Sequence, residues 1–152
     1  MVQSGGIMLT GEYIHSIDSK GRIIIPSKLR SSFGDSIIIT RGLDGCLFGY
    51  NYKVWQGIVD KLDTLPFTKK DARNFIRFFT SGAITLEFDK QGRINIPAFL
   101  SSYATLQDEV VIVGVINRIE IWNLKKWNEF MKNNVENLSD ISFNLFDSSL
   151  GL

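Results

Sequence analysis

The sequence predicts an α+β protein built from two copies of one unit of roughly 70 residues. Three observations carry this prediction: an ungapped internal repeat, apolar residues that alternate as in half-buried strands, and apolar residues at helical spacing. Two such copies either form a domain with a pseudo-twofold axis or stack into a larger assembly.

The repeat is clearest between Ser16–Pro26 and Glu87–Pro97, whose matching residues lie 71 positions apart. Aspartate, glycine, arginine, two isoleucines and proline agree without a gap. Further along, Trp55 matches Trp127. Agreement of this kind is improbable by chance in a short chain, and a duplication is its simplest origin.

Each copy is expected to open with a β-hairpin. Apolar residues alternate through Ala83–Phe88, which is the period of a strand with one buried face. Asp89–Gly92 is then a tight turn, because aspartate can accept turn N–H groups and glycine tolerates positive φ. Ile94 and Ile96 continue the alternation, and Tyr13–Ile25 repeats the pattern.

The remaining elements follow in the same order in both copies. Each proline can occupy the first turn of a short helix, and apolar residues at i, i+3, i+4 and i+7 indicate an amphipathic helix at the end of each copy. Asn123 is expected to cap the second of these helices. The predicted elements are short helices at 27–33 and 98–103, strand pairs Ile37–Thr40 with Cys46–Tyr50 and Val110–Gly114 with Arg118–Trp122, amphipathic helices carrying Trp55 and Trp127, and one extra helix between the copies.

Charge and composition limit the possible functions. The formal net charge is +1, from 17 Lys+Arg and 16 Asp+Glu, which is not the strongly basic balance usual for nucleic-acid binders. The positive charges cluster locally, however, around residues 18–30 and 66–80. No apolar run is long enough to span a bilayer, no secretory signal is recognisable, and one cysteine allows no internal disulfide. We therefore expect a soluble cytoplasmic protein.

Residues for enzyme chemistry are scarce. His15 and Cys46 are the single histidine and cysteine, so no Cys/His zinc cluster can form within a chain. His15 is expected to be structural or at the surface, and Cys46 to be a small core residue. Asp18 and Asp89 could meet as a catalytic dyad, but each has its own arginine four residues on, which favours the ionised carboxylate. We expect no enzyme, metal, cofactor or small-molecule substrate.

The repeated Asp-x-x-Gly-Arg has two interpretations. A tight turn needs aspartate and glycine whether or not it has a function. Arg22 and Arg93 are less easily explained this way, because an arginine held by its aspartate presents a fixed fork that suits phosphate oxygens or the O6/N7 edge of guanine. Lys20 and Lys90 would add attraction to phosphates.

The sequence resembles the MraZ family. The residues that carry the resemblance are Asp18–Arg22 with Ile25 and Pro26, Thr40–Leu47, Thr68–Arg73, Phe78–Ala83 and Asp89–Ile94. They occur in the family's order between Met8 and Lys132. The resemblance divides the chain into an N-terminal extension at 1–7, a first unit at 8–62, a connecting helix at 63–82, a second unit at 83–133 and a C-terminal tail at 134–152.

The resemblance implies a fold and a function. The fold is a duplicated swapped-hairpin β-barrel of the SpoVT-AbrB type, with flanking helices and a pseudo-twofold axis. The function is transcriptional regulation of the division and cell-wall gene cluster by a ring-shaped homo-oligomer, often an octamer, that binds promoter direct repeats in the nucleoid. The family's proposed DNA-reading motif falls on Asp18 and Arg22 and on Asp89 and Arg93. From their charge and position we also expect Lys20 and Lys90 to contact DNA, with Lys28 and Arg30 as possible phosphate contacts. The alternative is a structural ring or protein-interaction module that does not bind DNA.

Overall fold

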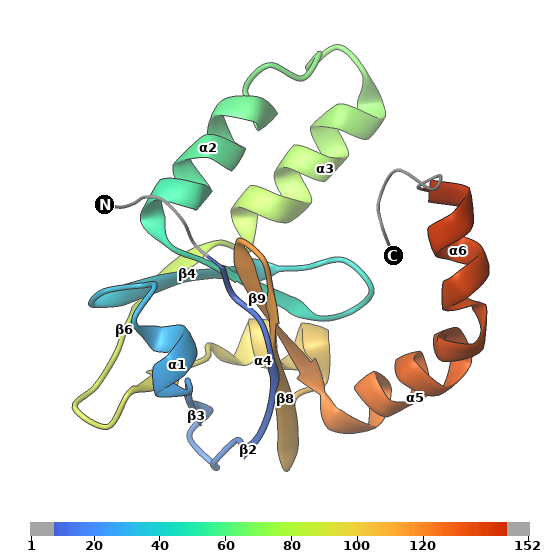
Figure 1. The fold of residues 1–152 in the computed structure, drawn as a ribbon. Helices are drawn as coiled ribbons and strands as arrows, with labels where there is room; N and C mark the ends of the chain where they lie inside the picture. Colours follow the sequence, from blue (N-terminus) through green and yellow to red (C-terminus); the bar gives the residue numbers. More distant parts are fainter. Residues whose placement is uncertain (1–7, 146–152) are drawn as a thin grey trace.

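The computed structural model describes residues 8–145, in which strands alternate with short and long helices (Figure 1). The elements of the first copy are β2 (Glu12–Ser16), β3 (Arg22–Ile24), α1 (Ser27–Arg30), β4 (Ser36–Arg41), β5 (Leu47–Tyr50) and α2 (Tyr52–Leu62), and the helix α3 (Lys70–Ser81) connects it to the second. Those that follow are β6 (Ile84–Glu87), β7 (Arg93–Asn95), α4 (Ala98–Ala104), β8 (Glu109–Val115), β9 (Arg118–Asn123), α5 (Leu124–Asn134), the 3-10 turn η1 (Val135–Asn137) and α6 (Leu138–Leu145).

The larger sheet interleaves strands of both copies. Its order is β2-β8-β9-β5-β4-β6, and every neighbouring pair is antiparallel. Strand β2 of the first copy pairs with β8 of the second, and β6 of the second copy pairs with β4 of the first. The two exchanges are equivalent, and the β5–β9 pair lies between them. The copies therefore form one body with a pseudo-twofold axis rather than two separate units.

A second, two-stranded sheet consists of β3 and β7, which we call the ribbon. Ile23 lies opposite Ile94 at its centre, and both side chains are buried. The backbone pairing continues past each strand end, where Ile25 N donates to Gly92 O and Ile96 N donates to Gly21 O. One strand of the ribbon comes from each copy, so neither copy can form it alone.

Two apolar clusters lie on opposite faces of the larger sheet. One joins the ribbon to the sheet and to α1 and α4, with Ile23, Ile25, Ile94 and Ile96 at its centre. The other joins the sheet to α2, α3 and α5 and contains all three tryptophans together with Phe48, Phe78 and Phe79. The ribbon and the helical pair α2–α3 thus lie on opposite sides of the protein (Figure 1).

The predicted strand pairs β4–β5 and β8–β9 are confirmed. The prediction that each copy opens with a local hairpin is wrong, because β2 does not pair with β3 and β6 does not pair with β7. The alternation of apolar residues identifies the buried face of a strand but not its partner, and the partner here comes from the other copy. The described strands form two separate sheets, and no pairing between β2 and β6 closes a barrel among residues 8–145.

Both long helices after the sheet strands begin at an asparagine cap. Asn123 Oδ1 accepts from Lys126 N at 3.1 Å, as predicted. Asn51, its counterpart in the first copy, accepts from Val54 N at 2.8 Å, and the sequence analysis did not identify it. Each cap satisfies one of the free N–H groups of the first turn and so sets where the helix starts.

Candidate nucleic-acid interface

The first Asp-x-x-Gly-Arg turn is held by its aspartate. Gly21 N donates to Asp18 O at 3.0 Å, and Asp18 N donates to Arg22 O at 3.1 Å, which closes the loop. Asp18 Oδ1 accepts from the backbone N–H of Lys20 and of Arg22, each at 2.9 Å. Gly21 adopts φ of +83°, which explains the glycine at this position. One carboxylate thereby satisfies two turn amides.

The second turn reproduces the first. Gly92 N donates to Asp89 O at 3.0 Å, and Asp89 Oδ1 accepts from the N–H groups of Gln91 and Arg93 at 2.9 Å each. Gly92 adopts φ of +78°. The agreement confirms the two predicted turns and shows that the motif forms the same local structure in each copy.

Each turn fixes one guanidinium group. Arg22 Nε donates to Asp18 Oδ2 at 2.6 Å, and Arg93 Nε donates to Asp89 Oδ2 at 2.7 Å. The terminal nitrogens of both arginines have no hydrogen-bond partner among the described residues. The Arg22 and Arg93 side chains are 33% and 27% exposed, so neither is sealed inside the protein. Each arginine is oriented through Nε, which leaves the donors on Nη1 and Nη2 unused in the described part of the chain.

The carboxylates in these pairs are held ionised. The pKa of Asp18 lies below its usual value, chiefly because the backbone amide of Arg22 donates to the carboxylate. Desolvation raises this pKa, whereas the Arg22 side chain and the Lys20 amide lower it further. The pKa of Asp89 is lowered in the same way by Arg93 and Gln91. Since both carboxyls are ionised and each is bound to its own arginine, they do not share a proton as a catalytic dyad would.

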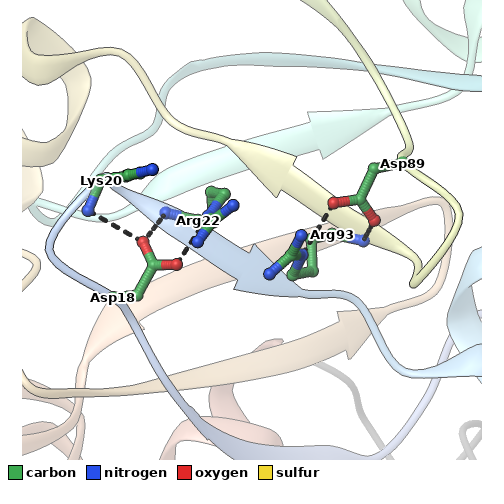
Figure 2. Close-up of polar contacts among 5 residues, drawn as sticks. All are labelled: Asp18, Lys20, Arg22, Asp89 and Arg93. Carbon is green, nitrogen blue, oxygen red and sulfur yellow. Dashed lines mark hydrogen bonds and ion pairs between the residues drawn. The ribbon is translucent and has the colours of Figure 1, made fainter.

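The ribbon brings the two arginines to one face (Figure 2). Arg22 lies opposite Asn95, and Arg93 lies opposite Ile24. Directly opposed residues share a face, so these four side chains lie on the outer side, away from buried Ile23 and Ile94. The Asp18–Arg22 and Asp89–Arg93 pairs stand at the two ends of this face, one from each copy.

The other predicted basic residues take different positions. Lys20 and Lys90 are exposed in the two turns, and Lys28 is exposed on α1. Arg30 is only partly exposed; its Nη1 donates to Ile25 O at 2.7 Å, and its guanidinium lies against Gly92. Arg30 of the first copy therefore packs on the turn of the second copy, a placement that follows from the strand exchange.

A hollow lies beside each turn and is closed on its other side by the short helix of the other copy. Beside the first turn it is lined by Asp18, Lys20 and, from α4, Ser101. Beside the second it is lined by Asp89 and, from α1, Arg30. Ser101 Oγ is buried without a hydrogen-bond partner among the described residues. The two hollows are equivalent in place but differ in charge.

Neither His15 nor Cys46 belongs to this face. His15 is half-buried in β2, opposite Val110. Cys46 is buried, as predicted, and burial raises the pKa of its thiol, which disfavours the thiolate form.

Residues 8–145 contain no cluster of three His, Cys, Asp or Glu side chains suited to a metal ion. None of the helices in the described part of the chain is long and apolar enough to span a membrane.

Sequence reasoning assigned no role to two residues on this face, Ile24 and Asn95. Both occupy the second position after the arginine of the repeat, and the available signal was that this position differs between the copies while the isoleucines on either side of it match. Their places opposite the arginines depend on the β3–β7 register, which pairs residues far apart in the chain and is not visible locally.

Comparison with known protein families agrees with the internal repeat. A family model described as "MraZ protein, putative antitoxin-like" matches residues 8–78 and matches again over residues 79–148. The two matches together cover nearly the whole chain.

Proposed function

The chain belongs to the MraZ family, and we propose that it is a sequence-specific DNA-binding transcriptional regulator that contacts DNA through the ribbon. The observation that carries the proposal is the outer face of β3 and β7, where one oriented arginine from each copy keeps its terminal nitrogens available. The major groove of DNA admits a two-stranded β-ribbon.

The geometry of the arginines suits base edges. A guanidinium group bonded through Nε can approach guanine with Nη1 and Nη2, which matches the paired acceptors O6 and N7. The ion pair with Asp18 or Asp89 limits the orientations of the side chain before binding, so less conformational entropy is lost on contact. Lys20 and Lys90, exposed in the turns, would contact the phosphates beside the groove, and Lys28 could extend that contact along α1.

The function implied by the family completes the proposal. The swapped-hairpin arrangement is supported by the exchange of β2 and β6 between the copies. We propose that the chain assembles into a ring, acts on promoter direct repeats upstream of the division and cell-wall gene cluster, and resides with the nucleoid in the cytoplasm. It is proposed to act without catalysis, as a regulator. Several weak ribbon contacts in one assembly would gain effective concentration from each other, which offsets the near-neutral charge of a single chain.

One observation favours a protein-interaction role beside or instead of DNA binding. Helix α6 follows the 3-10 turn η1 and extends away from the sheet (Figure 1). Its apolar residues remain exposed, Leu138 at 48%, Ile141 at 40% and Leu145 at 70%. A helix with this face suits another protein surface, and contact with a second copy would serve ring assembly.

The decisive experiment is a gel shift with the DNA upstream of the protein's own gene. Arg22→Ala and Arg93→Ala should each abolish or strongly weaken the specific shift while the assembly mass measured by light scattering stays unchanged. Arg22→Lys should retain part of the affinity but lose discrimination between sequences, because lysine keeps the charge without the fork.

A matched control is Arg77→Ala. Arg77 is an exposed arginine on α3, on the opposite side of the sheet, with Asn74 as its hydrogen-bond partner. The Arg77→Ala substitution removes the same charge from the chain and should leave the specific gel shift intact. Specific binding that survives the loss of both ribbon arginines would refute the proposal and favour the interaction role.

A further inference from the structure

The outer face of the ribbon is not symmetric, although the two turns have the same hydrogen bonds. Ile24 and Asn95 occupy the same position in the repeat, two residues after Arg22 and Arg93. In the antiparallel register each of them pairs with the arginine of the other copy: Arg22 lies opposite Asn95, and Arg93 lies opposite Ile24. One end of the ribbon thus combines an arginine with an amide, and the other combines an arginine with an aliphatic side chain.

Both of these side chains are available to a ligand. Ile24 is 41% exposed, whereas its neighbours Ile23 and Ile25 are fully buried in the core. Asn95 is also exposed, and its side-chain amide makes no hydrogen bond with the described residues; it lies close to Gly21 of the first turn. Neither residue is needed to fill the core, so the difference between them is free to serve recognition.

The chemistry of the two side chains matches different bases. The amide of asparagine carries a donor and an acceptor that pair with N7 and N6 of adenine in the major groove, whereas an aliphatic side chain contacts the methyl group of thymine. The arginine beside each suits guanine. Opposed residues have Cβ atoms about 5 Å apart, which is close enough for the two side chains to contact neighbouring base pairs.

We propose that Asn95 and Ile24 are specificity-determining residues that make the two ends of the ribbon read different sequences. The Arg22–Asn95 end would prefer guanine next to adenine, and the Arg93–Ile24 end would prefer guanine next to thymine. This inference rests on the proposed DNA-binding function. A ribbon with identical ends would read an inverted repeat, whereas this ribbon reads a site without twofold symmetry. The site therefore has a direction, which is what binding to direct repeats requires.

The experiment is selection of binding sites from randomised double-stranded DNA by the full chain, followed by sequencing. The wild type should select a site without twofold symmetry. Ile24→Asn, which places an asparagine at both ends, should select an inverted repeat with adenine beside each guanine. Asn95→Ile should select one with thymine beside each guanine. The affinity of each variant for the wild-type site should fall about tenfold, from the altered end alone.

Ile14→Asn is the matched control, because Ile14 is an exposed isoleucine in β2, outside the ribbon. It should select the wild-type site. Should Ile24→Asn or Asn95→Ile fail to fold by circular dichroism, Ile24→Ala and Asn95→Ala provide the same test, since each should lose the preference at one end only.

The outcomes separate the two levels of the proposal. Wild-type protein that selects no sequence would overturn both the DNA-binding function and this inference. If the wild type selects a site and Arg22→Ala abolishes binding, but the Ile24 and Asn95 variants select the unchanged site, the DNA-binding function stands and the inference is overturned.

Discussion

The two copies of the unit form the same turn but place it in different surroundings. In each, an aspartate accepts two backbone amides and holds its arginine through Nε, with distances that agree within 0.1 Å. Around the first turn stand Asn95 and the Ile96 carbonyl, and around the second stand Ile24 and Arg30. The repeated local sequence therefore produces the same turn twice, and the neighbouring residues that differ between the turns come from the other copy.

The helices that follow each sheet half differ more strongly. Helix α3 packs beside α2, and its Phe79 is 3% exposed among the rings of Phe48, Tyr50 and Trp55. Thr40 Oγ1 donates to Phe79 O at 2.6 Å and fastens the end of α3 to β4. Helix α6 has no such contact with the sheet in the described part of the chain. The two copies therefore agree in their turns and differ in these helices.

The largest expected difference concerns these helices. Phe79→Ala should lower the free energy of unfolding by about 3–5 kcal/mol, because it empties a buried aromatic site. Ile141→Ala in α6 should change it by less than about 0.5 kcal/mol, because the side chain is already exposed. Denaturant unfolding at low protein concentration measures both. Equal losses would mean that α6 packs on its own chain.

The turn glycines provide the next comparison. An alanine at Gly21 or Gly92 would have to adopt positive φ, which lowers the free energy of unfolding by about 1–2 kcal/mol. At Gly21 a Cβ would also lie 2.8 Å from the backbone carbonyl oxygen of Ile96, whereas at Gly92 it would meet the movable Arg30 side chain. Thermal unfolding should therefore show a larger loss for Gly21→Ala than for Gly92→Ala. The reverse order would contradict the packing described around the two turns.

The short helices allow a smaller comparison. Arg30→Ala removes the hydrogen bond to Ile25 O and should cost about 1 kcal/mol. Ser101→Ala, at the matching position of α4, should be neutral or slightly stabilising, since the Ser101 hydroxyl is buried without a partner in the described structure and alanine favours a helix. Unfolding curves of the two variants, measured side by side, test this. A clear loss for Ser101→Ala would indicate a partner for its hydroxyl.

The smallest difference is expected for pH, because the two aspartates accept the same kinds of hydrogen bond. The folded-state pKa values of Asp18 and Asp89 lie below the usual value of 3.8. Their contribution to stability is therefore fully present above that value and is lost only as the pH falls through the lowered folded-state values. NMR titration of the carboxyl carbons should give two similar midpoints, both below 3.8.

Asp18→Asn serves as the control for this titration, since it keeps an acceptor for the turn amides and removes the ionisable group. The Asp89 midpoint should not change in that variant. A midpoint for either carboxyl above its usual value would contradict the ion pairs.

Much of the local structure could be predicted from the sequence because it depends on neighbouring residues. The two turns, the β4–β5 and β8–β9 pairs, the buried Cys46 and the Asn123 cap all follow from spacing and residue type. The Asp–Arg pairs follow too, since four residues separate the partners across a tight turn. The Asn51 cap could also have been predicted, because Asn51 is the residue of the first copy that corresponds to Asn123.

What the sequence alone determined is that there are two copies, that each carries an oriented arginine on a turn, and which face of each strand is buried. The tertiary structure decided the partners: β2 joined β8, β6 joined β4, and β3 joined β7. These choices bring Arg30 to the second turn and Asn95 opposite Arg22. The physical reason is that a period-2 pattern specifies a face, while a strand's partner depends on apolar surface buried between segments far apart in the chain.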